Sequence, residues 1–136
     1  MYRPASDQAN LYENPNLFPG ARLNPVDRWI KLAGLIEWDR LEEKYKAGFN
    51  KEKSGRPAKN LRMALGAHII KERYHLSDLE TVKMIKENPY LQFFIGMTEF
   101  TYKAPFGVST MTWFRKRLEP VMTRGDIIAL AQRLPK

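Results

Sequence analysis

Apolar residues recur at helical spacing along most of the chain, and no segment shows the strict alternation of a half-buried β-strand. Between residues 60 and 74 the apolar positions cover most of the circumference of a helix: Leu61, Met63, Ala64, Leu65, Ala67, Ile69 and Ile70. A helix that is apolar nearly all round belongs at the centre of a bundle. The pattern predicts an all-α fold, a compact multi-helix bundle of roughly five to seven helices around this segment.

Residues 1–24 lack a helical pattern and predict an irregular N-terminal arm. Asn24 followed by Pro25 is typical of a helix start, because asparagine caps a first turn and proline fits the first helical position. A glycine weakens the pattern near residues 34–37, where we expect a break before a second short helix. The helical domain is predicted over residues 25–134.

A capping signal marks the helix that follows the central one. Ser77, with Glu80 three residues later, forms the pattern of a capping box. On this helix Leu79, Val82 and Ile85 are predicted to face the core, and the Asn-Pro pair that follows is expected to end it.

The last third of the chain predicts two more amphipathic helices. An aromatic run at residues 90–95 indicates a short helix over the core, and residues 97–108 indicate a loop. Ser109 is expected to cap the next helix, in which Trp113 is interpreted as a core residue rather than a platform for stacking. Residues 123–134 predict the final helix.

Charge and composition narrow the range of partners. Lysine and arginine total 23 against 15 acids, giving a formal net charge of +8, which favours a polyanion such as nucleic acid, although it can serve solubility alone. The chain has no cysteine, which excludes disulfides and a thiol nucleophile. It shows neither a secretory signal nor a membrane-spanning run, so we expect a cytoplasmic protein without a membrane partner.

Residues suited to catalysis are not grouped in the sequence. His68 and His75 have no third metal ligand placed with them and are interpreted as a packed helix residue and a turn residue. The acids are scattered, and no predicted strands bring carboxylates together for metal-assisted chemistry. We therefore expect no catalytic residues, no metal site and no cofactor.

The helix predicted from Ser109 carries the strongest functional signal. Short hydrogen-bonding side chains near a helix N-terminus suit phosphate contacts, and longer basic side chains reach base edges or phosphates. This arrangement predicts a helix-turn-helix-like unit on double-stranded DNA, with an ordinary capped surface helix as the alternative. The candidate DNA-binding residues are Ser109, Thr110, Thr112, Arg115, Lys116 and Arg117.

A basic segment, NKEKSGRPAK at residues 50–59, adds Lys53, Arg56 and Lys59 to these candidates. Its Gly-Arg-Pro faintly resembles an AT-hook core, in which an extended backbone offers one guanidinium to a minor groove. A solvated loop that leads into a helix is the commoner structure for such a segment, and both interpretations stay open.

Four segments follow one another in fixed order: WIKLAGLIEWDRLEEKY, GRPAKNLRMALGAHIIKERYHLSD, ENPYLQFFIG and PFGVSTMTWFRKRL. Together, over about residues 20–120, they resemble the N-terminal domain of bacterial insertion-sequence DDE transposases of the InsH-like group. The resemblance implies a helical module that binds DNA at element ends for transposition, ahead of an RNase H-like catalytic domain. Since that domain is absent here, no catalytic residue carries over and we expect the chain not to be an enzyme.

Three roles remain consistent with this resemblance. The first is the DNA-binding module of a transposase, which recognises element ends during DNA recombination. The second is an oligomerisation module that forms a homo-oligomer through the aromatic run at 90–95 and the last helix. The third is a stand-alone truncated regulator that competes for the element ends.

Overall fold

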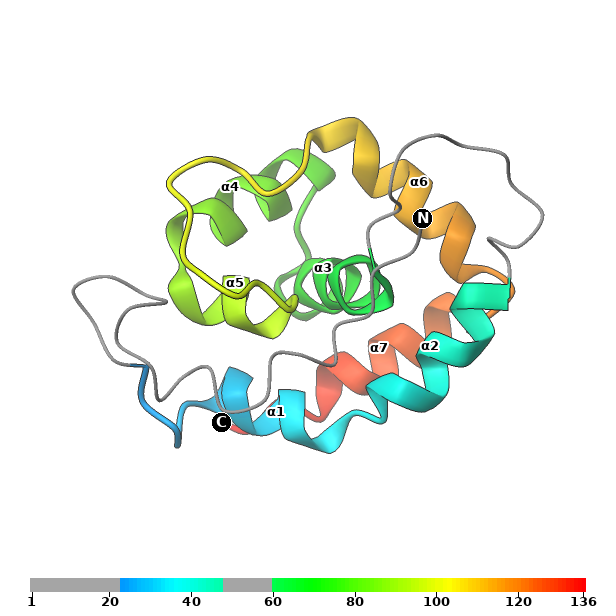
Figure 1. Cartoon of the computed structure of the whole chain (residues 1–136), viewed down its shortest axis with the longest axis horizontal. Helices are drawn as coiled ribbons and strands as arrows, with labels where there is room; N and C mark the ends of the chain where they lie inside the picture. The colour runs from blue at the N-terminus through cyan, green and yellow to red at the C-terminus, as the bar shows by residue number, and fades with distance from the viewer. Residues whose placement is uncertain (1–22, 48–59) are drawn as a thin grey trace.

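The computed structural model describes residues 23–47 and 60–136. These two ranges contain seven helices, joined by turns and loops, and no strand (Figure 1). The all-α prediction is therefore confirmed, whereas a helix-turn-helix unit stays a prediction. The helices are α1 (Arg28–Leu35), α2 (Trp38–Ala47), α3 (Leu61–Tyr74), α4 (Asp78–Glu87), α5 (Pro89–Phe94), α6 (Val108–Leu118) and α7 (Arg124–Gln132).

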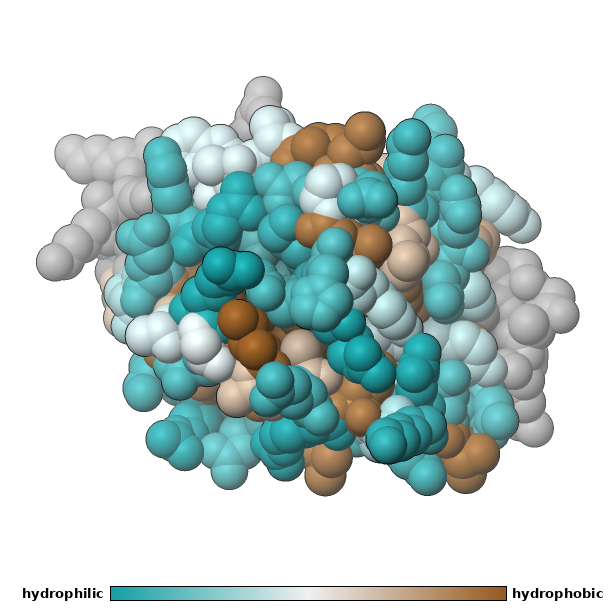
Figure 2. All heavy atoms as spheres, turned by 180° about the vertical axis from the view of Figure 1, so that it is seen from behind, coloured by the Kyte–Doolittle hydropathy of each residue, from teal (hydrophilic) through white to brown (hydrophobic). Residues whose placement is uncertain are grey.

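The central position predicted for residues 60–74 is confirmed. α3 lies in the middle of Figure 1, viewed nearly along its axis, and packs against α2, α4, α5, α6 and α7. Its first ten residues, Leu61–Ile70, are all buried. The Asn60 side chain caps the helix by accepting a hydrogen bond from the Met63 amide at 2.9 Å. From behind, the surface is mostly hydrophilic, with hydrophobic atoms in separate patches (Figure 2).

The predicted start of the first helix is wrong by several residues. Asp27, not Asn24, is the N-cap of α1, and its carboxylate accepts a hydrogen bond from the Trp29 amide at 2.8 Å. Asn24 forms a turn instead, because its side chain accepts from Val26 and its carbonyl accepts from the amide of Asp27. The break after α1 is confirmed, since Ile36 has an extended backbone.

The capping box of α4 is confirmed, but its buried face is not the predicted one. Ser77 and Glu80 exchange both hydrogen bonds, at 3.1 and 2.8 Å. Leu79 is 49% exposed, and fully buried Thr81 takes its place beside Val82 and Ile85. The Thr81 hydroxyl donates to the Ser77 carbonyl at 2.8 Å, so its polar atom is satisfied inside the core.

Two buried polar side chains hold α5 and the loop that follows it. Gln92 donates from its amide to the carbonyls of Ile85, Lys86 and Thr101, and accepts from the Thr101 amide at 2.9 Å. Arg62 donates to the carbonyls of Phe94 and Phe93 at the end of α5, at 2.9 and 3.1 Å. Burial lowers the pKa of this guanidinium to about 10.

The aromatic run at residues 90–95 forms α5 and its C-terminal cap, as predicted, and covers the core. Leu91, Phe93, Phe94 and Ile95 are all buried. Tyr90 is half-buried, so the run offers little exposed surface, and its role in assembly stays a prediction.

The predicted cap of α6 is wrong. Gly107 is the N-cap and contributes no side-chain hydrogen bond, while Ser109 lies within the first turn. The cap lies two residues earlier than predicted because Phe106 is buried edge-on against Phe114, with ring centroids 5.0 Å apart, and the chain turns directly after it. α7 confirms the last predicted helix and starts with a capping box between Thr123 and Asp126.

Candidate nucleic-acid interface

The α6 helix presents one face to the core and the opposite face to solvent. Met111, Phe114 and Leu118 are buried, and α6 packs against α3 and α4. The solvent side carries four exposed residues, which we call the outer face of α6: Ser109, Thr112, Trp113 and Lys116. Their spacing of three, four and seven residues places them on one side of a helix.

Trp113 corrects the sequence interpretation, because it is 58% exposed and lies on the outer face rather than in the core. The ammonium nitrogen of Lys116 lies 5.0 Å from the centroid of a Trp113 ring, a cation–π contact across one helical turn. The whole of α6, VSTMTWFRKRL, contains no acidic residue. The outer face therefore combines hydroxyls, an indole and a cation without a negative charge of its own.

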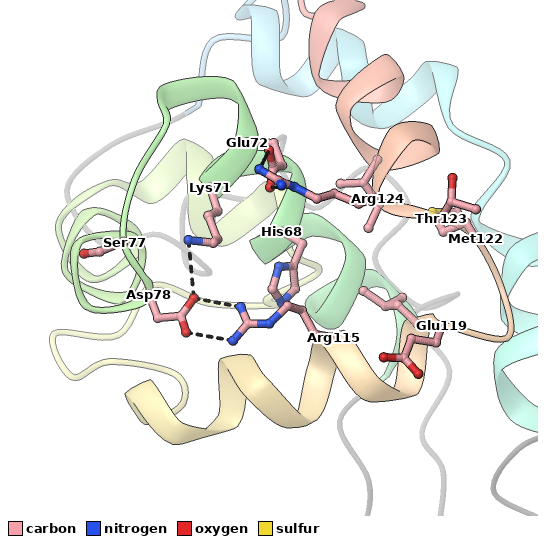
Figure 3. Close-up of a pocket in the computed structure, with 12 residues that line it drawn as sticks. His68, Lys71, Glu72, Ser77, Asp78, Arg115, Glu119, Met122, Thr123 and Arg124 are labelled. Atoms are coloured by element: carbon pink, nitrogen blue, oxygen red, sulfur yellow. Dashed lines mark hydrogen bonds and ion pairs between the residues drawn. The ribbon is translucent and has the colours of Figure 1, made fainter.

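Arg115 lies on the flank of α6 that faces the start of α4 (Figure 3). Its guanidinium donates two hydrogen bonds to the two carboxylate oxygens of Asp78, at 2.9 and 3.0 Å, and a third to the Thr112 hydroxyl at 3.2 Å. The hydrogen bond from Arg115 lowers the pKa of Asp78, and the same bond raises the pKa of Arg115. Lys71 approaches Asp78 as well, at 3.5 Å.

Beside this ion pair a cleft of about 760 Å³ separates α6 from α7 and the end of α3. Leu118, Met122 and Ile127 give it apolar walls. On its rim Arg124 pairs with Glu72 at 3.1 Å, as Arg115 pairs with Asp78 (Figure 3). The cationic groups of the cleft thus lie next to carboxylates, which makes it a weaker site for a polyanion than the outer face of α6.

His68 is buried in the wall of this cleft, as a packed helix residue. Its Nε2 lies 3.0 Å from the Met111 carbonyl and carries the proton, since a carbonyl oxygen only accepts. Burial lowers the pKa of the imidazole, an effect that the hydrogen bond to Met111 partly opposes. His75 ends α3 in the left-handed conformation, with φ of 55°, which confirms it as a turn residue.

The structure brings together part of the predicted site. Ser109, Thr112 and Lys116 share the outer face of α6, while half-buried Thr110 and Arg117 lie nearer the core and Arg115 is held by Asp78. The remaining predicted residues, Lys53, Arg56 and Lys59, lie outside the described residues. Contact between any of these residues and DNA stays a prediction.

Sequence reasoning missed Trp113 and Asp78 for different reasons. Trp113 lies at helical spacing from the polar residues Ser109, Thr112 and Lys116, and this spacing indicates an exposed position. Its large apolar side chain indicates a buried position instead, so the two signals conflict. Asp78 is 37 residues from Arg115, and no local pattern indicates that the two side chains meet.

Across residues 23–47 and 60–136, no three histidine, cysteine, aspartate or glutamate side chains gather closely enough to hold a metal ion. No helix in the same ranges has both the length and the apolar character needed to cross a membrane.

Comparison with known proteins places these helices in a family. The family model described as "Transposase domain (DUF772)" matches residues 19–117, from before α1 to the last turn of α6. An uncharacterized protein of Rhizobium meliloti, ORF8 in the nfe locus, is 41% identical over 118 residues, 87% of this chain and 55% of the relative. The chain thus spans about half the length of the curated relative that it matches. No solved structure gives a significant match.

Proposed function

The chain belongs to the transposase domain family DUF772, and on this premise we propose that it is a DNA-binding module, with the outer face of α6 lying against double-stranded DNA. The observation that carries the proposal is the composition of that face. Ser109, Thr112, Trp113 and Lys116 are exposed together on a helix without an acidic residue.

Cationic side chains bind the phosphates of duplex DNA, and serine and threonine hydroxyls are among the groups that contact its base edges. The outer face of α6 offers both. Gly107 leaves the first-turn amides of α6 without a side-chain cap, and amides at a helix N-terminus suit a phosphate group. These features support contact through the N-terminal half of α6, with Lys116 one turn further along the groove.

The basic residues of α6 differ in the charge that they bring to DNA. Arg115 is close to a carboxylate that offsets its charge, whereas Lys116 faces solvent over an indole. In this proposal Lys116 is the main phosphate contact, and Arg115 chiefly fixes α6 against α4. Lys53, Arg56 and Lys59 add contacts from the basic segment before α3.

Within the transposase family, we propose the finer role of recognising the ends of an insertion sequence, as in the InsH-like group of DDE transposases. Strand transfer would then belong to a part of the protein outside this chain. A regulator that competes for element ends would use the same face of α6. The alternative role in oligomerisation has the last helix as its main candidate surface, since most of the aromatic run is buried.

The test is a titration of the chain with a duplex that carries the terminal repeat of the parent element, at several salt concentrations. Wild type is expected to bind with a negative salt slope, and Lys116→Ala to weaken binding and reduce that slope by about one. Lys31→Ala is the matched control. Lys31 is exposed on α1, so its replacement removes one positive charge from the surface without changing the outer face of α6. The proposal is wrong if Lys116→Ala binds duplex DNA as wild type does.

A further inference from the structure

Trp113 has a larger exposed fraction than the other two tryptophans of the chain. Trp29 is buried against Phe94, and Trp38 is partly buried, with its indole N–H bonded to the Ala33 carbonyl at 2.8 Å. Trp113 keeps 58% of its surface in water at the centre of the outer face of α6. Tryptophan is enriched at interfaces because its ring is apolar and its N–H is polar, which makes this indole a candidate for contact with a partner.

The surroundings of the indole select the kind of partner. Lys116 lies over the ring, and the hydroxyls of Ser109 and Thr112 share its face of the helix. A complementary partner therefore presents negative charge and hydrogen-bonding groups around a small apolar group. The major groove of a duplex does so, since it admits a helix and its apolar feature is the C5-methyl group of thymine.

The same geometry argues against stacking between bases. The Lys116 ammonium lies over the indole at 5.0 Å from a ring centroid, so one face of the ring is already partnered by a cation. Insertion between two bases needs both faces free and requires the duplex to unstack. The edge of the ring and its remaining face are better suited to the floor of an intact groove.

We propose that Trp113 is the specificity-determining residue of this face and reads thymine methyl groups in the major groove, with Lys116 orienting the indole and binding a nearby phosphate. This inference rests on the proposed function, because it assumes that the outer face of α6 meets duplex DNA. It adds the chemical group that is recognised, and hence a preference for thymine at one or two positions of the site.

The experiment starts from the duplex that the wild-type chain selects out of a randomised pool. Each thymine of that duplex is replaced in turn by deoxyuridine, which removes only the methyl group. Wild type is expected to lose about fourfold in affinity at one or two positions, the effect of burying one methyl-sized group. Trp113→Ala is expected to bind about tenfold more weakly and to show no difference between thymine and deoxyuridine at those positions.

Two controls accompany this series. Trp113→Phe keeps an aromatic ring and should retain part of the methyl effect. Tyr102→Ala removes another exposed aromatic side chain, 81% exposed in the loop before α6, and should keep the full effect. Thermal melts of all variants should match wild type, since neither aromatic side chain is buried.

The outcomes separate this inference from the proposed function. If wild type binds duplex DNA with a salt slope but tolerates deoxyuridine everywhere, or if Trp113→Ala keeps the methyl effect, the inference is overturned and the DNA-binding role stands. If wild type binds no duplex, both fail. If Trp113→Ala leaves DNA binding unchanged but alters the sedimentation of the chain, the ring belongs to a protein interface and the inference is overturned.

Discussion

Arg115 of α6 and Asp78 in the first turn of α4 form a two-point ion pair, with nitrogen–oxygen distances of 2.9 and 3.0 Å. Two parallel hydrogen bonds fix the relative orientation of both groups more tightly than a single contact does. Asp78 also lies at the positive end of the α4 dipole and near Lys71. One carboxylate therefore joins three helices around the cleft.

The pair places a carboxylate in competition with DNA for Arg115. We expect Asp78→Asn to bind duplex DNA several-fold more tightly than wild type, with a salt slope steeper by about one, because the charge of Arg115 is then no longer offset by a carboxylate. Fluorescence anisotropy at several salt concentrations measures both quantities. Equal slopes for the two proteins would show that Arg115 does not reach phosphate.

Asp78 also predicts a response to acid. Its pKa in the folded chain is lowered from the ordinary value of 3.8, so the pair stabilises the fold above that pH and the contribution is lost as the pH falls through the folded-state pKa. Because the pair is partly exposed, we expect a contribution of about 1 kcal/mol or less. Urea melts should show a gap in the free energy of unfolding between wild type and Asp78→Asn at pH 6, and this gap should narrow as the pH falls below 3.8.

His68 predicts a second dependence on pH, in a higher range. Burial lowers the pKa of the folded-state imidazole from 6.5, so the unfolded chain binds more protons as the pH falls below that value. The free energy of unfolding should therefore be constant above about pH 7 and decrease toward pH 5. His68→Gln retains an N–H donor for the Met111 carbonyl but does not titrate, so its melts should lack this decrease.

Two leucines provide a matched test of the core. Leu65 is fully buried in α3, and its replacement by alanine should cost about 2–5 kcal/mol in denaturant melts. Leu79→Ala removes the same atoms from a half-exposed position on α4 and should cost much less, within about 1 kcal/mol. Similar losses for the two variants would contradict the central place of α3.

A further prediction concerns catalysis. We expect the chain alone neither to cleave nor to join DNA in the presence of magnesium or manganese, because its acids are scattered along the sequence and no three potential metal ligands gather within residues 23–47 and 60–136. The measurement is a gel assay with a labelled duplex carrying the terminal repeat. Metal-dependent cleavage that disappears when acids of this chain are replaced would refute the prediction.

The helical architecture could be predicted from the sequence because periodicity and capping are local signals. The all-round apolar pattern of residues 60–74 identified α3, and Ser77 with Glu80 identified the start of α4. The cap of α1 was not predictable in the same way, because Asn24 forms a turn and Asp27 caps the helix instead.

The candidate site was less predictable because it depends on tertiary contacts. The sequence analysis predicts a core position for Trp113, but the residue lies on the exposed side of the helix with Lys116. The sequence predicts DNA contact for both Arg115 and Lys116, but Asp78 distinguishes the two residues in the fold. That distinction arises only when α4 and α6 pack together.

The hydrogen bonds of Gln92 have a consequence for the connection between α5 and α6. By holding both backbone groups of Thr101, this side chain divides one long connection into two shorter spans, residues 95–100 and 102–107. A shorter span has fewer conformations to lose when its ends are fixed, so α6 starts from a better-defined position. The hydrogen bonds of Gln92 therefore act as a noncovalent crosslink between α5 and the connection, in a chain that has no cysteine and hence no disulfide.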